Sequence, residues 1–264
     1  MANILDEILS VKRREVEKAK RERPLPLIEK ALASLPHPRS MRESISSGSG
    51  IISEFKRKSP SKGWIHPDAR VEEVVPSYTR AGASALSILT DREFFGGDSA
   101  FVETARPLTH LPILRKEFVI DEYQVYEARA IGADAILVIA AAMTPERARA
   151  LCRKAHELDL EVLMEVHCLR ELDSFNEYVD MIGVNNRDLR VFRTDPEVSV
   201  SLFESLPKEA LPVSESGLLD PGVAARLRKV GYRGFLVGEA FMKEEDPGLA
   251  LSNYISSIEA ALKD

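Results

Sequence analysis

Eight short segments rich in β-branched and aliphatic residues recur along this 264-residue chain. They are residues 50–56, 83–91, 111–118, 134–141, 160–167, 181–186, 211–217 and 234–240, and their starts lie 21 to 33 residues apart. Each interval accommodates a strand, a loop, an amphipathic helix and a second loop. Strict alternation of strands and helices predicts parallel strands that are covered by helices. Eight such units favour an α/β fold closed into a (β/α)8 TIM barrel, which needs about 250 residues, over an open doubly wound sheet.

Helical patterns occupy six of the remaining stretches, at residues 71–82, 123–132, 145–159, 169–178, 196–206 and 221–231. Three of these helices are preceded by a residue that favours the N-cap, namely Asp121, Thr144 and Asp220. Glycines that can adopt a positive φ stand at three predicted helix ends, at positions 82, 132 and 231. These boundaries support the barrel.

The first 48 residues stand outside the eight units. Residues 4–9 carry an apolar helical stripe, and the charge-dense residues 12–23 follow it. We expect that charge run to form a solvated helix face, and a second helix to cover residues 27–35. We therefore predict a helical extension, residues 1–48, that packs on the catalytic barrel of residues 49–264 near its active face within a single domain.

Charge and cysteine content limit the partners of the chain. A formal net charge of -6 argues against general nucleic-acid binding, which a basic domain usually provides. The only cysteines, Cys152 and Cys168, form no CxxC pair, so neither a disulfide framework nor a structural zinc site is expected. The N-terminus lacks the pattern of a signal peptide, and the longest apolar run, residues 135–143, is much shorter than the roughly 20 residues that span a bilayer. We expect a soluble cytoplasmic protein without membrane or nucleic-acid partners.

The first predicted strand, residues 50–56, ends in charged residues. Side chains alternate along a strand, so Ile52, Glu54 and Lys56 share one face. Burying an ion costs several kcal/mol unless it is paired or used. A loop with small residues and cations, residues 57–63, follows and suits a phosphate group. This pattern is typical of a functional site.

Other predicted strands also end in polar residues. In a TIM barrel the chemistry lies at the carboxyl ends of the strands. Those ends supply Glu54, Lys56, Asp91, Lys116, Glu165, Asn185, Arg187, Glu215 and Ser216. Lysines beside glutamates can exchange protons near neutral pH, because burial and charge shift their pKa values. The alternative is a set of salt bridges that closes the mouth of the barrel.

Glycine-containing loops predict a phosphate site. Barrels often bind phosphate with the loops that follow their last two strands, here residues 214–217 and 237–240. Gly217 and Gly238 would allow backbone N–H groups to approach a ligand, and Ser59 and Lys56 could reach it from the first loop.

Aromatic side chains follow or precede several of the predicted strand ends, and the histidines are scattered. Phe94, Phe95, Trp64 and Phe118 could offer ring faces to an aromatic substrate. The five histidines show no metal-ligand spacing, and for His167, near a strand end, a structural role is favoured. We expect no metal and no cofactor.

In this order, the segments resemble the indole-3-glycerol phosphate synthase family over essentially the whole chain. The matching strings are SEFKRKSPSKG at 53–63, LSILTD at 86–91 with FFGG at 94–97, PILRKEF at 112–118, EVLMEVH at 161–167, IGVNNRDL at 182–189, VSESG at 213–217 and LVGE at 236–239. Two departures are Glu117, where the family usually has Asp, and Trp64, where an aliphatic residue is common.

The resemblance implies a carboxy-lyase of tryptophan biosynthesis. Its substrate would be 1-(2-carboxyphenylamino)-1-deoxyribulose 5-phosphate, a phosphosugar joined to anthranilate, and its product indole-3-glycerol phosphate. By analogy, the catalytic residues are Glu54, Lys56, Lys116, Glu165, Asn185 and Glu215. The substrate-binding residues by analogy are Ser59, Phe118, Arg187, Ser216, Gly217, Gly238 and, through its backbone, Glu239.

Three alternatives remain open at this point. A related barrel enzyme, phosphoribosylanthranilate isomerase, has similar phosphate loops but relies on a Cys/Asp pair, and no Cys lies near the start of this barrel. A Schiff-base aldolase would also use a lysine at a strand end. A non-catalytic phosphosugar-binding barrel would lack the acid and base residues. We expect a monomer that contacts neighbouring tryptophan-pathway enzymes.

Overall fold

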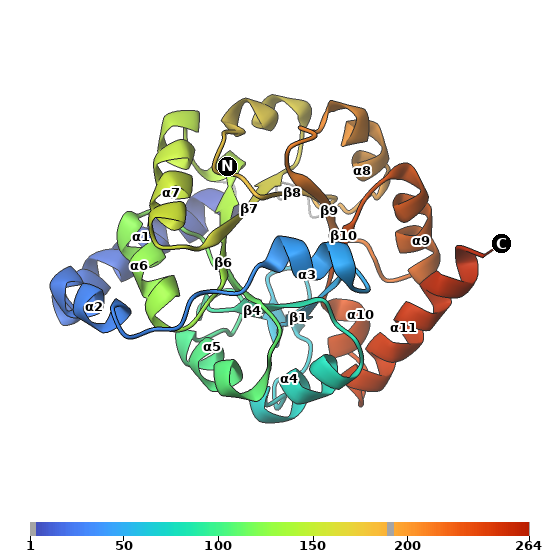
Figure 1. The fold of residues 1–264 in the computed structure, drawn as a ribbon, viewed down its shortest axis with the longest axis horizontal. Helices are drawn as coiled ribbons and strands as arrows, with labels where there is room; N and C mark the ends of the chain where they lie inside the picture. Colours follow the sequence, from blue (N-terminus) through green and yellow to red (C-terminus); the bar gives the residue numbers. More distant parts are fainter. Residues whose placement is uncertain (1–3, 189–192, 264) are drawn as a thin grey trace.

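Eight parallel strands close into a barrel in the computed structural model, which describes residues 4–188 and 193–263 (Figure 1). In order around the barrel they are β1 (Ile51–Phe55), β4 (Ala85–Leu89), β5 (Ile113–Lys116), β6 (Ala135–Ile139), β7 (Glu161–Val166), β8 (Met181–Asn185), β9 (Leu211–Glu215) and β10 (Gly234–Val237). The first strand pairs with both the second and the last, which closes the sheet. The predicted (β/α)8 barrel is confirmed. Leu189, the last residue of the string at 182–189, lies outside the described residues.

Helices cover the outside of the barrel. They are α4 (Val71–Arg80), α5 (Ser99–Ala105), α6 (Glu122–Ala130), α7 (Pro145–Glu157), α8 (Glu197–Leu202), α9 (Pro221–Val230) and α11 (Pro247–Ala261), with the short α10 (Glu239–Met242) after β10. The predicted N-caps are confirmed, because the side chains of Asp121, Thr144 and Asp220 each accept a hydrogen bond from the first turn. The predicted helix at 169–178 is wrong, since a 3-10 helix over Leu169–Ser174 stands there. No pattern predicted α5 or α11.

Alternation along the strands separates two cores. Ile52, Leu114 and Leu163 belong to the cluster inside the barrel. Ile51 and Phe55, which point to the other face of β1, belong to the larger cluster between the strands and the helices. Glu54, Lys116 and Glu165 follow the inward-facing positions by two residues, so the same alternation directs them into the barrel.

Three helices precede the barrel: α1 (Ile4–Glu22), α2 (Leu25–Leu32) and α3 (Met41–Ser47). Figure 1 shows α3 crossing one end of the barrel, α2 beside α6, and α1 behind them. Met41 and Ile45 of α3 pack into the interior cluster and close the amino end of the barrel. Glu161, at the start of β7, accepts hydrogen bonds from Ser40 and from the backbone N–H of Met41 and Arg42. The extension is thus fixed to the barrel by both apolar and polar contacts.

One residue of the predicted solvated charge run is not solvated. Lys12 of α1 is only 3% exposed, and its ammonium contacts three carboxylates. The prediction is wrong here because the helix lies against the barrel, and a buried lysine needs acidic partners that are distant in sequence. Within the described residues, no helix combines the length and apolarity needed to cross a membrane.

Candidate active site

A cavity of about 540 Å³ opens at the carboxyl ends of the barrel strands. Every residue predicted from the sequence as catalytic or substrate-binding lines this cavity: Glu54, Lys56, Ser59, Lys116, Phe118, Glu165, Asn185, Arg187, Glu215, Ser216, Gly217, Gly238 and Glu239. The structure therefore brings the whole predicted set together. Asp91, also noted at a strand end, is fully buried and contacts Lys12 instead.

Lys116 occupies the centre of the charged residues. Its Nζ lies 2.9 Å from Glu165 Oε2 and 3.0 Å from Glu215 Oε2. Burial lowers the pKa of Lys116, but attraction by Glu165 and Glu215 outweighs it and the pKa is raised above its ordinary value. Lys116 is therefore a charged donor at neutral pH, in contact with two acceptors.

The two glutamates beside Lys116 differ in their pKa values. Burial opposes ionisation of Glu165, yet the charges of Lys116 and His167 lower its pKa to about 2. Burial, together with the negative charges of Glu165 and Glu54, raises the pKa of Glu215 to about 7 despite the help of Lys116. A pair of carboxyl groups with separated pKa values is typical of acid and base chemistry. Glu165 is the permanent anion, and Glu215 can gain or lose a proton near neutral pH.

A second acid and base pair lies at the carboxyl end of the first strand. Lys56 Nζ lies 2.5 Å from Glu54 Oε1, and Glu54 is buried. Gly238 packs against this pair, and a Cβ atom at its position would stand 2.5 Å from Glu54 Oε1 and 3.0 Å from Glu54 Cβ. Glycine is therefore the residue that leaves room for Glu54 beside the loop after β10.

A further part of the cavity rim is built from backbone and small polar side chains. Lys58–Ser59 (β2) and Gly63–Trp64 (β3) form an antiparallel hairpin, in which Ser59 Oγ accepts a hydrogen bond from the backbone N–H of Lys62. Ser216 and Gly217 both have positive φ values, 64° and 74°, and such a value is uncommon outside glycine. Such a rim presents polar groups to a small anion.

Arg187 connects this rim to the end of β8. Its guanidinium donates a hydrogen bond to the hydroxyl of Ser61, and its backbone N–H donates to Asn185 Oδ1 at 3.0 Å. The side chain therefore bridges the loop after β1 and the loop after β8 across the cavity mouth.

Two aromatic rings form a further part of the wall. Phe95 and Phe118 line the cavity, with ring centroids 6.0 Å apart and planes tilted by 41°. The structure does not support the same role for Trp64, which is 55% exposed and lies beside the cationic groups of Arg57 and Lys58. Phe94 is also absent from the lining of this cavity in the described part of the chain.

Sequence reasoning missed several contributors to the site. Ile4, Leu5 and Ile8 of α1 line the cavity. The sequence predicted that their segment packs near the active face, but none of the three was named as a site residue. His167 lies 3.4 Å from Glu165 and 3.2 Å from Glu171, and these carboxylates raise its pKa although burial lowers it. The Glu-Val-His spacing of β7 could have indicated this contact, because residues two apart share a face.

Among the described residues, no cluster of three or more His, Cys, Asp or Glu side chains has the arrangement of a metal site. The chemistry available to the cavity's own residues is proton transfer and electrostatic stabilisation around a ligand with an anionic end and an apolar end.

The family model and the relatives found by sequence agree on one family. The family model described as indole-3-glycerol phosphate synthase matches residues 5–253. Indole-3-glycerol phosphate synthase of Bacteroides thetaiotaomicron is 53% identical over 260 residues, which cover 98% of this chain and 100% of that protein. The protein of the same name from Dechloromonas aromatica is 42% identical over 258 residues, with 96% and 98% covered. A solved structure of thiamine phosphate pyrophosphorylase from Pyrococcus furiosus has a TM-score of 0.61 at 20% identity, over 84% of this chain and all of that chain, which shows a shared fold alone.

Proposed function

Since this chain belongs to the indole-3-glycerol phosphate synthase family, we propose that the residues around Lys116 and Glu54 carry out the two halves of that reaction. The enzyme is a carboxy-lyase of tryptophan biosynthesis. It converts 1-(2-carboxyphenylamino)-1-deoxyribulose 5-phosphate into indole-3-glycerol phosphate, carbon dioxide and water. This identity decides against the isomerase, the aldolase and the non-catalytic barrel.

Ring closure is assigned to Lys116. The ring carbon that bears the carboxylate must attack the ketone carbon of the sugar chain, and the ketone oxygen becomes negative as the bond forms. A general acid that donates a proton to this oxygen lowers the barrier. Lys116 is suited to this role because Glu165 and Glu215, at 2.9 and 3.0 Å, hold it in its charged form.

We assign to Glu165 the stabilisation of the positively charged intermediate. After ring closure the aromatic system carries positive charge until the bond to the carboxylate breaks and its electron pair restores the ring. A carboxylate that stays ionised stabilises this charge, and the pKa of about 2 for Glu165 meets that condition. Glu165 also accepts a hydrogen bond from Lys116, so it can assist proton transfer.

Dehydration is assigned to Glu54 and Lys56. The former ketone oxygen must leave as water after it gains a proton, and the adjacent carbon must lose one. Glu54 as base and Lys56 as acid supply both transfers from one strand end, with 2.5 Å between them. Asn185, Arg187 and Glu215 would orient the substrate and the catalytic groups.

The two ends of the substrate fit opposite sides of the cavity. We assign the phosphate to the polar rim, which consists of Ser59, Lys56, Ser216, Gly217, Gly238 and the backbone of Glu239. The anthranilate ring is assigned to the apolar side near Phe118 and Phe95, since aromatic pairs prefer tilted contacts with ring centroids a few ångströms apart.

The observation that carries these assignments is the contact of Lys116 with two carboxylates inside a cavity of about 540 Å³. The test is to mix the purified protein with the carboxyphenylamino sugar phosphate and to follow indole fluorescence. Fluorescence should grow with wild-type protein and not with Lys116→Met. Turnover of phosphoribosylanthranilate in place of this substrate would contradict the proposal.

We further propose that the enzyme acts as a monomer in the cytoplasm and contacts neighbouring enzymes of its pathway. A complete set of catalytic groups from one chain supports the monomer, and two unpaired cysteines are typical of a reducing compartment. Light scattering of the purified protein tests the monomer, and crosslinking in cell extract tests the contacts.

A further inference from the structure

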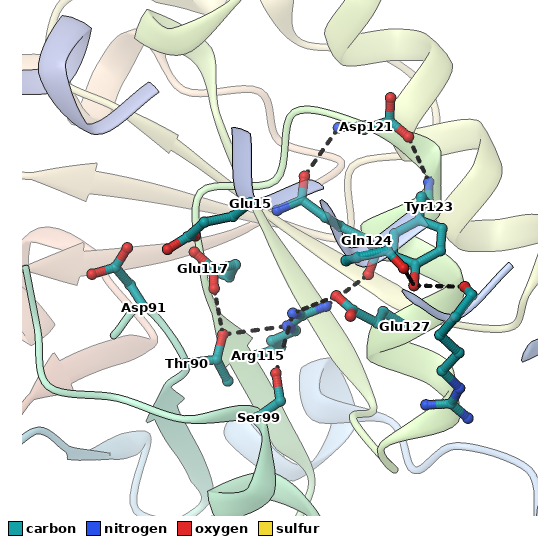
Figure 2. A network of polar contacts seen from close by, with 12 residues as sticks. Glu15, Thr90, Asp91, Ser99, Arg115, Glu117, Asp121, Tyr123, Gln124 and Glu127 are labelled. Carbon is teal, nitrogen blue, oxygen red and sulfur yellow. Dashed lines mark hydrogen bonds and ion pairs between the residues drawn. The ribbon is translucent and has the colours of Figure 1, made fainter. Parts of the chain in front are cut away.

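The ammonium of Lys12 lies between three carboxylates outside the catalytic cluster. Its distances are 2.6 Å to Glu15 Oε2, 2.9 Å to Glu117 Oε1 and 3.0 Å to Asp91 Oδ2. Figure 2 shows Glu15, Asp91 and Glu117 gathered in one region beside α1. Glu15 shares α1 with Lys12, whereas Asp91 follows β4 and Glu117 follows β5. One cation therefore joins the extension to two neighbouring strand ends.

The buried carboxylates of Asp91 and Glu117 accept hydrogen bonds from the backbone N–H groups of aromatic residues. Asp91 Oδ1 accepts hydrogen bonds from the N–H groups of Phe94 and Phe95, at 2.8 and 3.2 Å. Glu117 Oε1 accepts one from the N–H of Phe118 at 2.8 Å. Phe95 and Phe118 are the two rings that face each other in the cavity wall. Their separation thus depends on how closely the Asp91 and Glu117 segments are held together.

A second connection reaches the catalytic lysine. Thr90 donates its hydroxyl hydrogen to Glu117 Oε2 at 2.8 Å and its backbone N–H to the carbonyl of Lys116 at 3.2 Å. Figure 2 shows Thr90 between Glu117 and Arg115, whose guanidinium contacts Glu127 of α6. The same network therefore ties the ends of β4 and β5 at the level of Lys116.

Lys12 supplies the positive charge that both buried carboxylates, Asp91 and Glu117, contact. Asp91 and Glu117 are almost completely buried, and within the described residues Asp91 Oδ2 makes no hydrogen bond, so the Lys12 ammonium is its ionic contact. Without the ammonium between them the two buried carboxylates repel each other. Asp91 then keeps only its hydrogen bonds from backbone N–H groups, whereas Glu117 keeps the charge of Arg115 and the hydroxyl of Thr90. Removal of Lys12 would drive the two segments apart.

We propose that Lys12 is a positioning residue that sets the width of the aromatic end of the cavity by holding the Phe95 and Phe118 segments together. This inference rests on the proposed assignment of the anthranilate ring to that end. Ile8 lies one helical turn before Lys12 and lines the same cavity, so α1 approaches this end with both an apolar and a charged contact. The phosphate rim lies on other loops and is independent of Lys12.

The test is Lys12→Met, with Lys18→Met as the matched control, because the Lys18 side chain on the same helix is 68% exposed. We expect KM for the carboxyphenylamino sugar phosphate to rise at least tenfold in Lys12→Met, with a smaller change in kcat. Inorganic phosphate serves as a competitive probe of the other end, and its inhibition constant should stay within twofold of the wild-type value. The control should match wild type in all three quantities.

A second variant guards against misfolding. Lys12→Met with Asp91→Asn removes one cation and one carboxylate, so the net charge of the cluster is unchanged and the carboxylate repulsion is relieved. The ionic link from α1 to the ends of β4 and β5 is still lost, so KM should still rise at least threefold, with phosphate inhibition unaltered. An unchanged KM in either folded variant would overturn the proposal, as would a parallel rise in KM and in the phosphate constant, which indicates general loosening. Inactive wild-type and control proteins would instead overturn the proposed function, and the positioning role with it.

Discussion

Replacing Lys116 by methionine should make the stability of the protein fall more steeply with pH above neutrality. Methionine keeps the length of the side chain and removes its charge, so Glu165 and Glu215 lose the cation that they share. Burial already raises the pKa of Glu215 to about 7 in the presence of Lys116. Without Lys116 this pKa must rise further, because the lysine charge is one of the influences that lower it.

The sign and the size of this change in the free energy of unfolding follow from proton linkage. A carboxyl group whose folded-state pKa is raised contributes stability below its unfolded pKa, roughly 4.3 for glutamate, and that contribution is lost as pH rises through the folded value. In wild type the loss is complete soon above pH 7. If the variant's pKa reaches about 9, the variant loses about 2 kcal/mol more than wild type between pH 7 and pH 9.

Urea unfolding followed by circular dichroism at pH 7, 8 and 9 measures this difference, with Lys18→Met as the surface control. The free energies of unfolding of wild type and Lys116→Met should diverge with pH, while the control runs parallel to wild type. Parallel curves for all three proteins would refute the electrostatic reasoning. The same variant should lose at least a thousandfold in kcat/KM, about 4 kcal/mol, and retention within tenfold would refute the acid role of Lys116.

Three further variants test the geometry of the site. Gly238→Ala should lower kcat at least a hundredfold, because the added Cβ would stand 2.5 Å from Glu54 Oε1 and displace that base; steady-state kinetics measure it. Gly183→Ala should lower kcat at least tenfold with phosphate inhibition unchanged, because its Cβ would collide with Glu215 Oε1 inside the barrel. Glu215→Gln should bring the alkaline loss of kcat/KM to lower pH, because Lys116 loses one of the charges that raise its pKa.

Each of these variants has a control or an outcome that would contradict the prediction. Gly222→Ala on α9 is a glycine change remote from the cavity, and it should leave kcat unchanged. If Gly238→Ala keeps the kcat of wild type, the added Cβ does not displace Glu54, and the described contact between Gly238 and Glu54 is wrong. A phosphate constant that rises with the loss of kcat in Gly183→Ala would point to a wider disturbance. An alkaline limb that stays in place in Glu215→Gln would mean that Lys116 does not titrate there.

The sequence was sufficient for the barrel and for the convergence of the charged residues. Alternation with period two relates Glu54, Lys116 and Glu165 to apolar neighbours whose inward direction is required by the core. In a parallel barrel, residues at the carboxyl ends of different strands must then meet at one mouth. Local patterns and one topological rule therefore predicted that these charged residues meet, whereas the choice of catalytic and binding residues came from the family resemblance.

Tertiary contacts explain what local patterns did not predict. The burial of Lys12 depends on Asp91 and Glu117, which are about 80 and 105 positions away, and a charge run gives no sign of such partners. The α5 helix is only seven residues long and is held by packing on the barrel, whereas α11 begins with an Asp246-Pro247 pair that could have indicated it. The 3-10 helix after β7 ends at Ser174 because the backbone of Phe175 is extended, so the helical pattern does not continue to residue 178.

The helical extension has a consequence for how the chain folds during translation. Lys12 leaves the ribosome long before Glu117 and Glu161, to which the extension attaches, are synthesised. At typical elongation rates the delay between residues 12 and 117 is roughly 5 to 20 s. The first strand also waits for the last, since β1 pairs with β10. The nascent N-terminal helices therefore spend this interval without their docking surface, and it is the period in which chaperones would meet their apolar faces.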